Sequence, residues 1–265
     1  MSEPTPDQPS GDTRVRSRTR PRRQRASFLG VMGEILITVG AVTLLFVVWQ
    51  LWIGDLIYGA ERNATGSELS EQWAQEYTPS PAATPLPTDD AEPTDVTADP
   101  VILPEPADAE VFGVMRVPRF GDDYFVEMAG GVTRARTLDP IGIGHYPGTK
   151  MPGEEGNFAV AAHRTTWGKP FNQIAELHVG DAIVVETRDG WYTYRFRTLE
   201  YVTPNEVEVL LPVPQQVDVA ANEAYITMTS CSPMYSLAER IVAYGVFESF
   251  TPRDAGEPAS LTDGV

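Results

Sequence analysis

The chain contains a single cysteine, so any thiol chemistry must run through Cys231. This residue follows the alternating run AYITMTS and precedes Ser232-Pro233, a pair expected to end a strand. Arg240 lies nine residues later, in the strand-like run RIVAYGVF. An arginine beside a thiol favours the thiolate and can stabilise a developing oxyanion. These residue types therefore indicate nucleophilic catalysis at Cys231.

Three histidines are available as a partner for the thiol. His163 ends the apolar run NFAVAA and is followed by polar residues, so it lies, like Cys231, where a strand stops. Both side chains would then open onto the same end of a β-structure. His145 lies in the Gly/Pro-rich stretch GIGHYPGT and is either structural or lines a groove, whereas His178 precedes a Gly-Asp turn and reads as surface. His163 is the favoured partner.

Short β-type runs separated by turn signals must position these side chains. They cover residues 111–117, 123–128, 157–162, 182–187, 191–202, 225–229 and 240–247. Asp189-Gly190 is a strong hairpin signal between two of the runs. About two helical turns are expected at residues 170–177. The fold class is mainly β, as a closed barrel or a sandwich.

An apolar stretch at residues 35–53 is long enough to span a bilayer as a single helix. Seven arginines precede it, and the next 57 residues hold thirteen acidic residues and one arginine. Arginine-rich flanks stay in the cytoplasm, so we expect a single-pass plasma-membrane protein with its N-terminus inside and the following domain outside. A cleaved signal peptide and a buried core helix are the alternatives.

The composition divides the chain into five parts. They are an Arg-rich cytoplasmic tail (1–34), a transmembrane helix (35–53), a stalk with a Pro-rich linker (54–110), a compact domain (111–250) and a disordered tail (251–265). Within the third part, residues 54–77 are expected to be helical. Residues 78–107 hold eight prolines and are expected to form an extended tether.

Three segments together resemble a known family: GIGHYPGTKMPGEEGNFAV, AVAAHRTTWGKPF and TMTSCSPMYSLAERIVAYG. They are similar to a sortase, most closely to the class E housekeeping sortases of high-GC Gram-positive bacteria. The resemblance covers residues 111–250 and implies an eight-stranded, closed β-barrel with short helices. It also implies His163, Cys231 and Arg240 as the catalytic set. One position departs from the family's TLxTC block, because Ser230 stands where threonine usually precedes the cysteine.

The resemblance implies a cysteine transpeptidase that cleaves an LAxTG- or LPxTG-type sorting signal between Thr and Gly. The Cys231 thiolate would attack the carbonyl, Arg240 would steady the tetrahedral intermediate, and the His163 imidazolium would protonate the leaving amine. An amine of lipid II or of peptidoglycan would then resolve the acyl-enzyme. The partners implied are secreted proteins that carry a C-terminal sorting signal.

Substrate contacts are expected from three residues near this set. Tyr146 matches a class E tyrosine that lines the groove near the second position of the signal, where a phenol can bond to a backbone N–H that proline lacks. The alternative is that Tyr146 only packs a loop. Thr229 and Ser230, which directly precede Cys231, are secondary candidates.

Composition also excludes several classes of function. The net charge of −17 argues against a nucleic-acid partner. One cysteine and three separated histidines argue against a disulfide or a dedicated metal site, and no cofactor is expected. Two other readings stay open: a different cell-wall Cys/His peptidase or hydrolase, and a non-catalytic domain with an inert, buried Cys231.

Overall fold

The computed structural model describes residues 27–49, 53–77 and 98–262. Residues 1–26 of the expected cytoplasmic tail and most of the Pro-rich tether lie outside these residues. The two long helices are α1 (Phe28–Val48) and α2 (Gly54–Glu76). The strands are β1 (Val111–Arg116), β2 (Val126–Gly130), β3 (Ile143–His145), β4 (Gly156–Ala162), β5 (Ala182–Glu186), β6 (Gly190–Val202), β7 (Ala224–Ser232) and β8 (Glu239–Pro252). The short helices are η2 (Pro118–Phe120), η3 (Arg134–Leu138), η4 (Ile174–Glu176), η5 (Val207–Leu210), η6 (Arg253–Ala255) and η7 (Ala259–Leu261).

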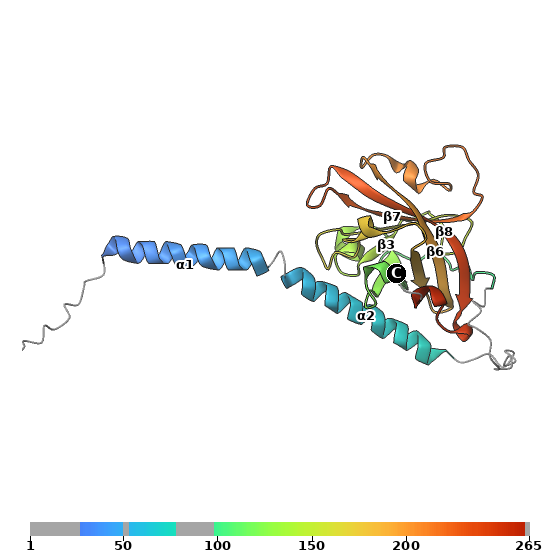
Figure 1. The fold of residues 1–265 in the computed structure, drawn as a ribbon, viewed down its shortest axis with the longest axis horizontal. Helices are drawn as coiled ribbons and strands as arrows, with labels where there is room; N and C mark the ends of the chain where they lie inside the picture. Colours follow the sequence, from blue (N-terminus) through green and yellow to red (C-terminus); the bar gives the residue numbers. More distant parts are fainter. Residues whose placement is uncertain (1–26, 50–52, 78–97, 263–265) are drawn as a thin grey trace, which may run out of the picture. The chain divides into compact units, whose positions relative to one another are not determined.

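The eight strands form a closed barrel in the order β1-β2-β3-β4-β7-β8-β6-β5, which confirms the predicted mainly β fold (Figure 1). The pairs β2–β3 and β4–β7 are parallel, and the other neighbours are antiparallel. Large apolar side chains fill the interior, among them Phe158, Tyr194 and Met228, each with no exposed surface. Closure leaves no free strand edge.

The expected strands agree with the observed ones except in a few places. The three-residue strand β3 was not expected, because it lies in a stretch rich in glycine and proline. Strands β7 and β8 are longer than their apolar runs, and β2 begins at Val126 instead of Asp123. The expected two helical turns at residues 170–177 reduce to the single 3-10 turn η4. The hairpin at Asp189-Gly190 is confirmed, because β5 and β6 pair on either side of it.

A buried polar network holds β4 against β7. Asn157 of β4 and Thr227 of β7 are almost fully buried, and the Thr227 hydroxyl donates to Asn157 Oδ1 at 2.7 Å. The Asn157 amide in turn donates to the carbonyls of Val209 and Leu211 in the segment that connects β6 to β7. Buried polar groups are costly unless each is bonded, so this network stabilises one register of the pair.

Helix α1 is long and apolar enough to cross a membrane, as expected for this part of the chain. Its 21 residues correspond to about 30 Å of helix, the thickness of a hydrocarbon core. The helix begins at Phe28, seven residues before the expected start, and ends at Val48. Of the expected span, residues 50–52 lie outside the described residues.

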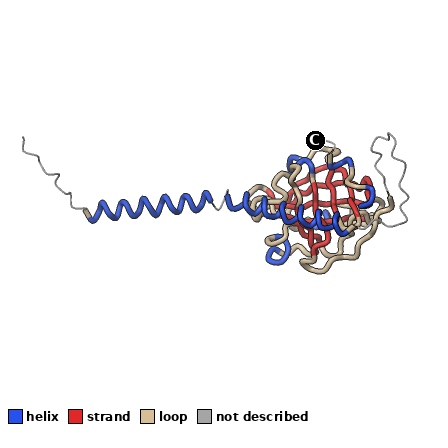
Figure 2. The backbone as a smooth tube through the Cα atoms, turned by 90° about the horizontal axis from the view of Figure 1, so that it is seen from below, coloured by secondary structure: helices blue, strands red, loops and turns tan. Residues whose placement is uncertain are grey.

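Helix α2 covers the residues expected to be helical, and it packs on the barrel against β1 and β2 (Figures 1 and 2). Trp73, a residue of this helix, is buried. A Cβ added at Gly66 would lie 2.4 Å from the Phe125 carbonyl oxygen, so only glycine permits the helix to approach this closely. The helix is therefore an integral part of the folded domain.

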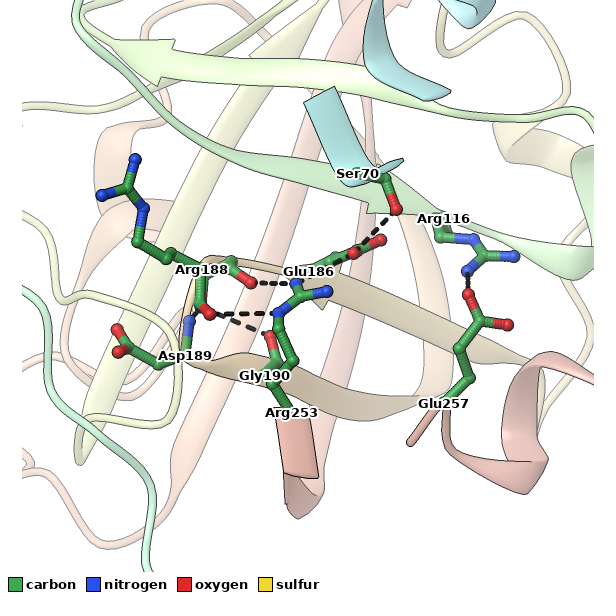
Figure 3. A network of polar contacts seen from close by, with 9 residues as sticks. Ser70, Arg116, Glu186, Arg188, Asp189, Gly190, Arg253 and Glu257 are labelled. Atoms are coloured by element: carbon green, nitrogen blue, oxygen red, sulfur yellow. Dashed lines mark hydrogen bonds and ion pairs between the residues drawn. The ribbon is translucent and has the colours of Figure 1, made fainter. Parts of the chain in front are cut away.

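An ion pair between Glu186 and Arg253 is buried where α2 meets the C-terminal segment (Figure 3). The Arg253 guanidinium donates to Glu186 Oε1 at 2.9 Å and lies over the ring of Trp191. Ser70 of α2 donates to the same carboxylate oxygen at 2.8 Å. Because Arg253 and Ser260 are buried, residues 251–262 are ordered on the barrel, which corrects the expectation of a disordered tail from residue 251.

We expect Arg253→Met to lower the free energy of unfolding by about 3–5 kcal/mol, because it leaves the Glu186 carboxylate buried without its cation. Denaturant unfolding of the full-length protein in detergent measures this loss. Arg188→Met is the matched control, since Arg188 is 70% exposed beside Glu76 and its removal should cost less than about 1 kcal/mol. Equal losses for the two variants would contradict this role of the buried pair.

Candidate active site

Three neighbouring strands carry the residues expected to act together. Cys231 of β7 lies directly opposite Arg240 of β8 in the antiparallel register, so the two side chains share one face. On the other side of β7, the parallel register with β4 pairs Ala161 with Thr229. His163 directly follows the end of β4, two residues beyond that pair. His163, Cys231 and Arg240 therefore come from the ends of three neighbouring strands, and all three line one groove.

Cys231 is a free, partly exposed cysteine at the end of β7. Its backbone carbonyl accepts a hydrogen bond from Arg164 Nη1 at 3.3 Å. Arg164 directly follows His163 and is almost fully buried. This bond connects the segment after β4 to the end of β7. The exposure of Cys231 contradicts the reading of an inert cysteine sealed in the interior.

His163 is mostly buried and is paired with a carboxylate. Its Nε2–H donates to Asp139 Oδ1 at 2.6 Å, and the side chains are 12% and 19% exposed. Arg134 approaches the same carboxylate oxygen at 3.5 Å. Burial lowers the pKa of His163 below its usual 6.5, and the bond to Asp139 opposes that shift. Because Nε2 is used in this bond, Nδ1 is the ring nitrogen left for proton transfer.

Arg240 is held at the base of the loop that joins β7 to β8. Its Nη1 donates to the backbone carbonyls of Glu239 at 2.9 Å and Leu237 at 3.2 Å. The residue is half-buried, and it faces the same groove as Cys231. A guanidinium fixed in this way keeps a permanent positive charge on the residue that pairs with Cys231 across β7 and β8.

A groove of about 590 Å³ contains all three residues. Tyr146, Thr229 and Ser230 line it as well, so the expected substrate contacts lie in the same cavity. Its outer wall includes Tyr235 and Leu237, which are 80% and 71% exposed. The groove is large enough for several residues of an extended peptide.

The hydroxyls of Thr229 and Ser230 bond to strand β4. Ser230 Oγ donates to the Ala162 carbonyl at 2.8 Å, one residue before His163. Thr229 Oγ1 donates to the Val160 carbonyl at 3.3 Å and also bonds to the Tyr146 hydroxyl at 2.9 Å. Because threonine has one hydroxyl proton, Tyr146 is the donor in that second bond. The lone pairs of the Tyr146 oxygen are then free to accept an N–H from a ligand.

The other two histidines lie outside this groove. His145 is fully buried in β3, stacks on Phe158 at 5.4 Å, and bonds to the Lys150 carbonyl through Nε2. Of the two readings for His145, the structure favours the structural one. His178 is exposed, as expected. Among the described residues no cluster of His, Cys, Asp and Glu has the arrangement of a metal site.

Two residues of the site were not expected from sequence. Asp139 lies in the turn TLDPIG, 24 residues before His163, and nothing local distinguishes it from the other acidic residues. Arg164 stands in the HRTT motif, but its bond to the Cys231 carbonyl depends on the parallel pairing of β4 with β7. Both contacts are made by the fold between segments distant in sequence.

A model of the sortase domain matches residues 115–248. Sortase SrtE1 of Streptomyces coelicolor is 33% identical over 98% of this chain and 69% of its own length. The chain belongs to the sortase family. Among solved structures, the SrtA sortase from Actinomyces oris has a TM-score of 0.60 at 33% identity, over 63% of this chain and 96% of that one. A Streptomyces coelicolor Sortase E1 structure with a tripeptide in the active site has a TM-score of 0.54 at 34% identity, over 59% of this chain and 99% of that one.

The resemblance to class E sortases is thereby confirmed, as is the expected sortase enzyme. The expectation of an eight-stranded sortase barrel is also confirmed. Sortases are cell-envelope transpeptidases, which fits the candidate membrane helix α1 of this sortase.

We expect Ser230→Thr to retain stability and Ser230→Ala to lose about 1–3 kcal/mol, because only the second leaves the buried Ala162 carbonyl without its donor. Thermal and denaturant unfolding of the full-length protein measure the two changes. Equal stability of Ser230→Ala and the unsubstituted protein would show that the hydroxyl does not hold β4 and β7 together.

Proposed function

We propose that this sortase is a membrane-anchored transpeptidase that cleaves an LAxTG- or LPxTG-type signal between Thr and Gly. The acyl group would pass to an amine of a cell-wall precursor, such as lipid II. The observation that carries the proposal is that His163, Cys231 and Arg240 all line one open groove, with Cys231 and Arg240 paired across β7 and β8. The tripeptide in the active site of the Streptomyces coelicolor Sortase E1 structure supports a peptide substrate in this groove.

In the proposed reaction the Cys231 thiolate attacks the threonine carbonyl carbon of the bound signal. The electron pair of the C=O bond moves to oxygen, and the positive charge of Arg240 stabilises the resulting oxyanion. His163, as imidazolium, gives its Nδ1 proton to the glycine nitrogen as the C–N bond breaks. A thioester remains on Cys231. The attacking amine then gives its proton back to His163 while the thiolate leaves.

The protonation state of His163 limits this reaction. Because burial lowers the pKa of His163, the imidazolium is the minor form at neutral pH. The Asp139 carboxylate partly offsets this effect, since it stabilises the charged ring. The enzyme therefore works with a small population of the required form, and that population depends on the Asp139 contact.

Tyr146 is the proposed contact for the second position of the signal. Its hydroxyl proton is used in the bond to Thr229, so its oxygen presents an acceptor to the groove. An alanine at the second position offers a backbone N–H to this acceptor, whereas a proline offers none. The arrangement favours LAxTG over LPxTG.

We further propose an N-in, C-out topology, with the barrel outside the plasma membrane. Seven arginines before α1 support this orientation, because basic flanks remain in the cytoplasm. Secreted proteins with a C-terminal sorting signal and membrane-held precursors would then meet the enzyme on one side of the membrane.

We expect Cys231→Ala to abolish transpeptidation of an LAxTG peptide to an amine while leaving the barrel folded. Intact-mass spectrometry detects the thioester on the enzyme, and it measures the loss of thioester formation directly. His178→Ala is the control, since His178 is exposed and outside the groove. Product formation by Cys231→Ala would refute the proposed nucleophile, and release of acyl acid without any amine product from the unsubstituted enzyme would indicate a hydrolase.

We expect Tyr146→Phe to lower kcat/KM for LAxTG by about fivefold to tenfold, the effect of one hydrogen bond. The same substitution should leave kcat/KM for LPxTG almost unchanged, because that signal has no N–H at the second position. Parallel assays of the two peptides with the full-length protein test the difference. An equal loss for both peptides would mean that Tyr146 only packs the loop.

A further inference from the structure

Helix α2 contacts the segment that carries Asp139. Arg62 of α2 is almost fully buried, and its Nη2 donates to the backbone carbonyls of Asp139 and, at 3.4 Å, Leu138. These two residues end the short helix η3, and the Asp139 carboxylate bonds to His163. A guanidinium from the N-terminal helix therefore holds the backbone of the residue that pairs with the imidazole.

The same helix contacts the segment that follows His163. The ring of Tyr58 packs against Trp167 with centroids 5.6 Å apart. A Cβ added at Gly168 would lie 3.0 Å from the backbone nitrogen of Gly59, so the two backbones are in close contact. Helix α2 thus touches the chain on both sides of His163. It contacts residues 138–139, of which Asp139 bonds to the imidazole, and residues 167–168, which follow His163 in sequence.

We propose that α2 is a positioning element of the active site, in which Arg62 acts through Asp139 to set the orientation and protonation of His163. This proposal rests on the proposed role of His163 as proton donor. Asp139 is the residue in direct contact with the ring, and Arg62 is one step further away. Neither touches the substrate or the reacting atoms.

The charges around His163 determine the direction in which its pKa should move when the Asp139 segment is disturbed. The charged groups that face the ring are Asp139 and Arg134 from the η3 segment and Arg62 from α2. The carboxylate favours the imidazolium, whereas both arginines disfavour it. Loosening the Asp139 segment without removing any positive charge therefore lowers the pKa of His163. Removing the Arg62 charge alone has the opposite direct effect, so the test must keep that charge.

Arg62→Lys meets this requirement, because lysine keeps the charge but lacks Nη2, the guanidinium nitrogen that donates to both carbonyls. We expect the His163 titration to move to lower pH, in the same direction as in Asp139→Asn. NMR of the full-length protein in detergent, labelled at its three histidines, measures the shift. With an LAxTG peptide and an amine we expect kcat to fall roughly tenfold with little change in KM. The reason is that a less well positioned His163 loses part of the rate enhancement that a proton donor supplies. Ser70→Ala is the control, since Ser70 contacts the barrel through Glu186.

A second variant moves the helix without changing any charge. Gly66→Ala places a methyl group against the Phe125 carbonyl and should displace α2, whereas Thr65→Ala changes an exposed neighbour. We expect Gly66→Ala, but not Thr65→Ala, to shift the His163 titration downward and to lower kcat. Wild-type titration and kcat in both Arg62→Lys and Gly66→Ala, with only reduced stability, would overturn the proposal. Because the NMR shift needs no turnover, it tests α2 even if the proposed transpeptidation fails.

Discussion

The parallel pairing of β4 with β7 is the constraint on which the groove depends. A slip of one residue would turn every side chain of a strand to the opposite face. Two polar contacts oppose such a slip: the buried Asn157–Thr227 bond and the Ser230–Ala162 bond near the end of the pair. The register they stabilise brings the end of β4, which His163 follows, to the same groove as Cys231. The antiparallel pairing with β8 then adds Arg240 on the other side.

The site combines a partly exposed sulfur with a mostly buried imidazole. Exposure leaves Cys231 accessible, while burial of His163 disfavours the charged ring that the proposed proton transfer to the leaving amine requires. Asp139 reduces this conflict, since its carboxylate bonds to the ring. The contact depends in turn on the backbone of residues 138–139, which α2 holds through Arg62. We therefore infer that the protonation state of His163 depends on α2, the helix that follows the candidate membrane span.

Much of this architecture follows from the sequence, since the longer strands alternate apolar and polar residues and end in clear turn signals. The sequence also suggested the three proposed catalytic residues as candidates, because His163 and Cys231 each stand where an apolar run stops. Strand β3 was not, because three residues among glycines carry no periodic pattern. Asp139 and Arg62 were also hidden, since one is an ordinary acid in a turn and the other is the lone cation of an acidic stretch. Their partners are brought to them only by barrel closure and by the packing of α2.

In the proposed mechanism, the imidazole and the guanidinium both face the peptide bond that the Cys231 sulfur attacks. A crystal structure of the protein with Cys231 covalently bound to an LAxTG-like peptide mimic, carrying a thiol-reactive group at the threonine carbonyl, tests it most directly. We expect Arg240 within about 3.5 Å of the modified carbonyl oxygen. We also expect His163 Nδ1 to face the position of the leaving nitrogen, with Nε2 still bonded to Asp139. A complex in which Cys231 is modified while His163 or Arg240 faces away from the peptide would contradict it.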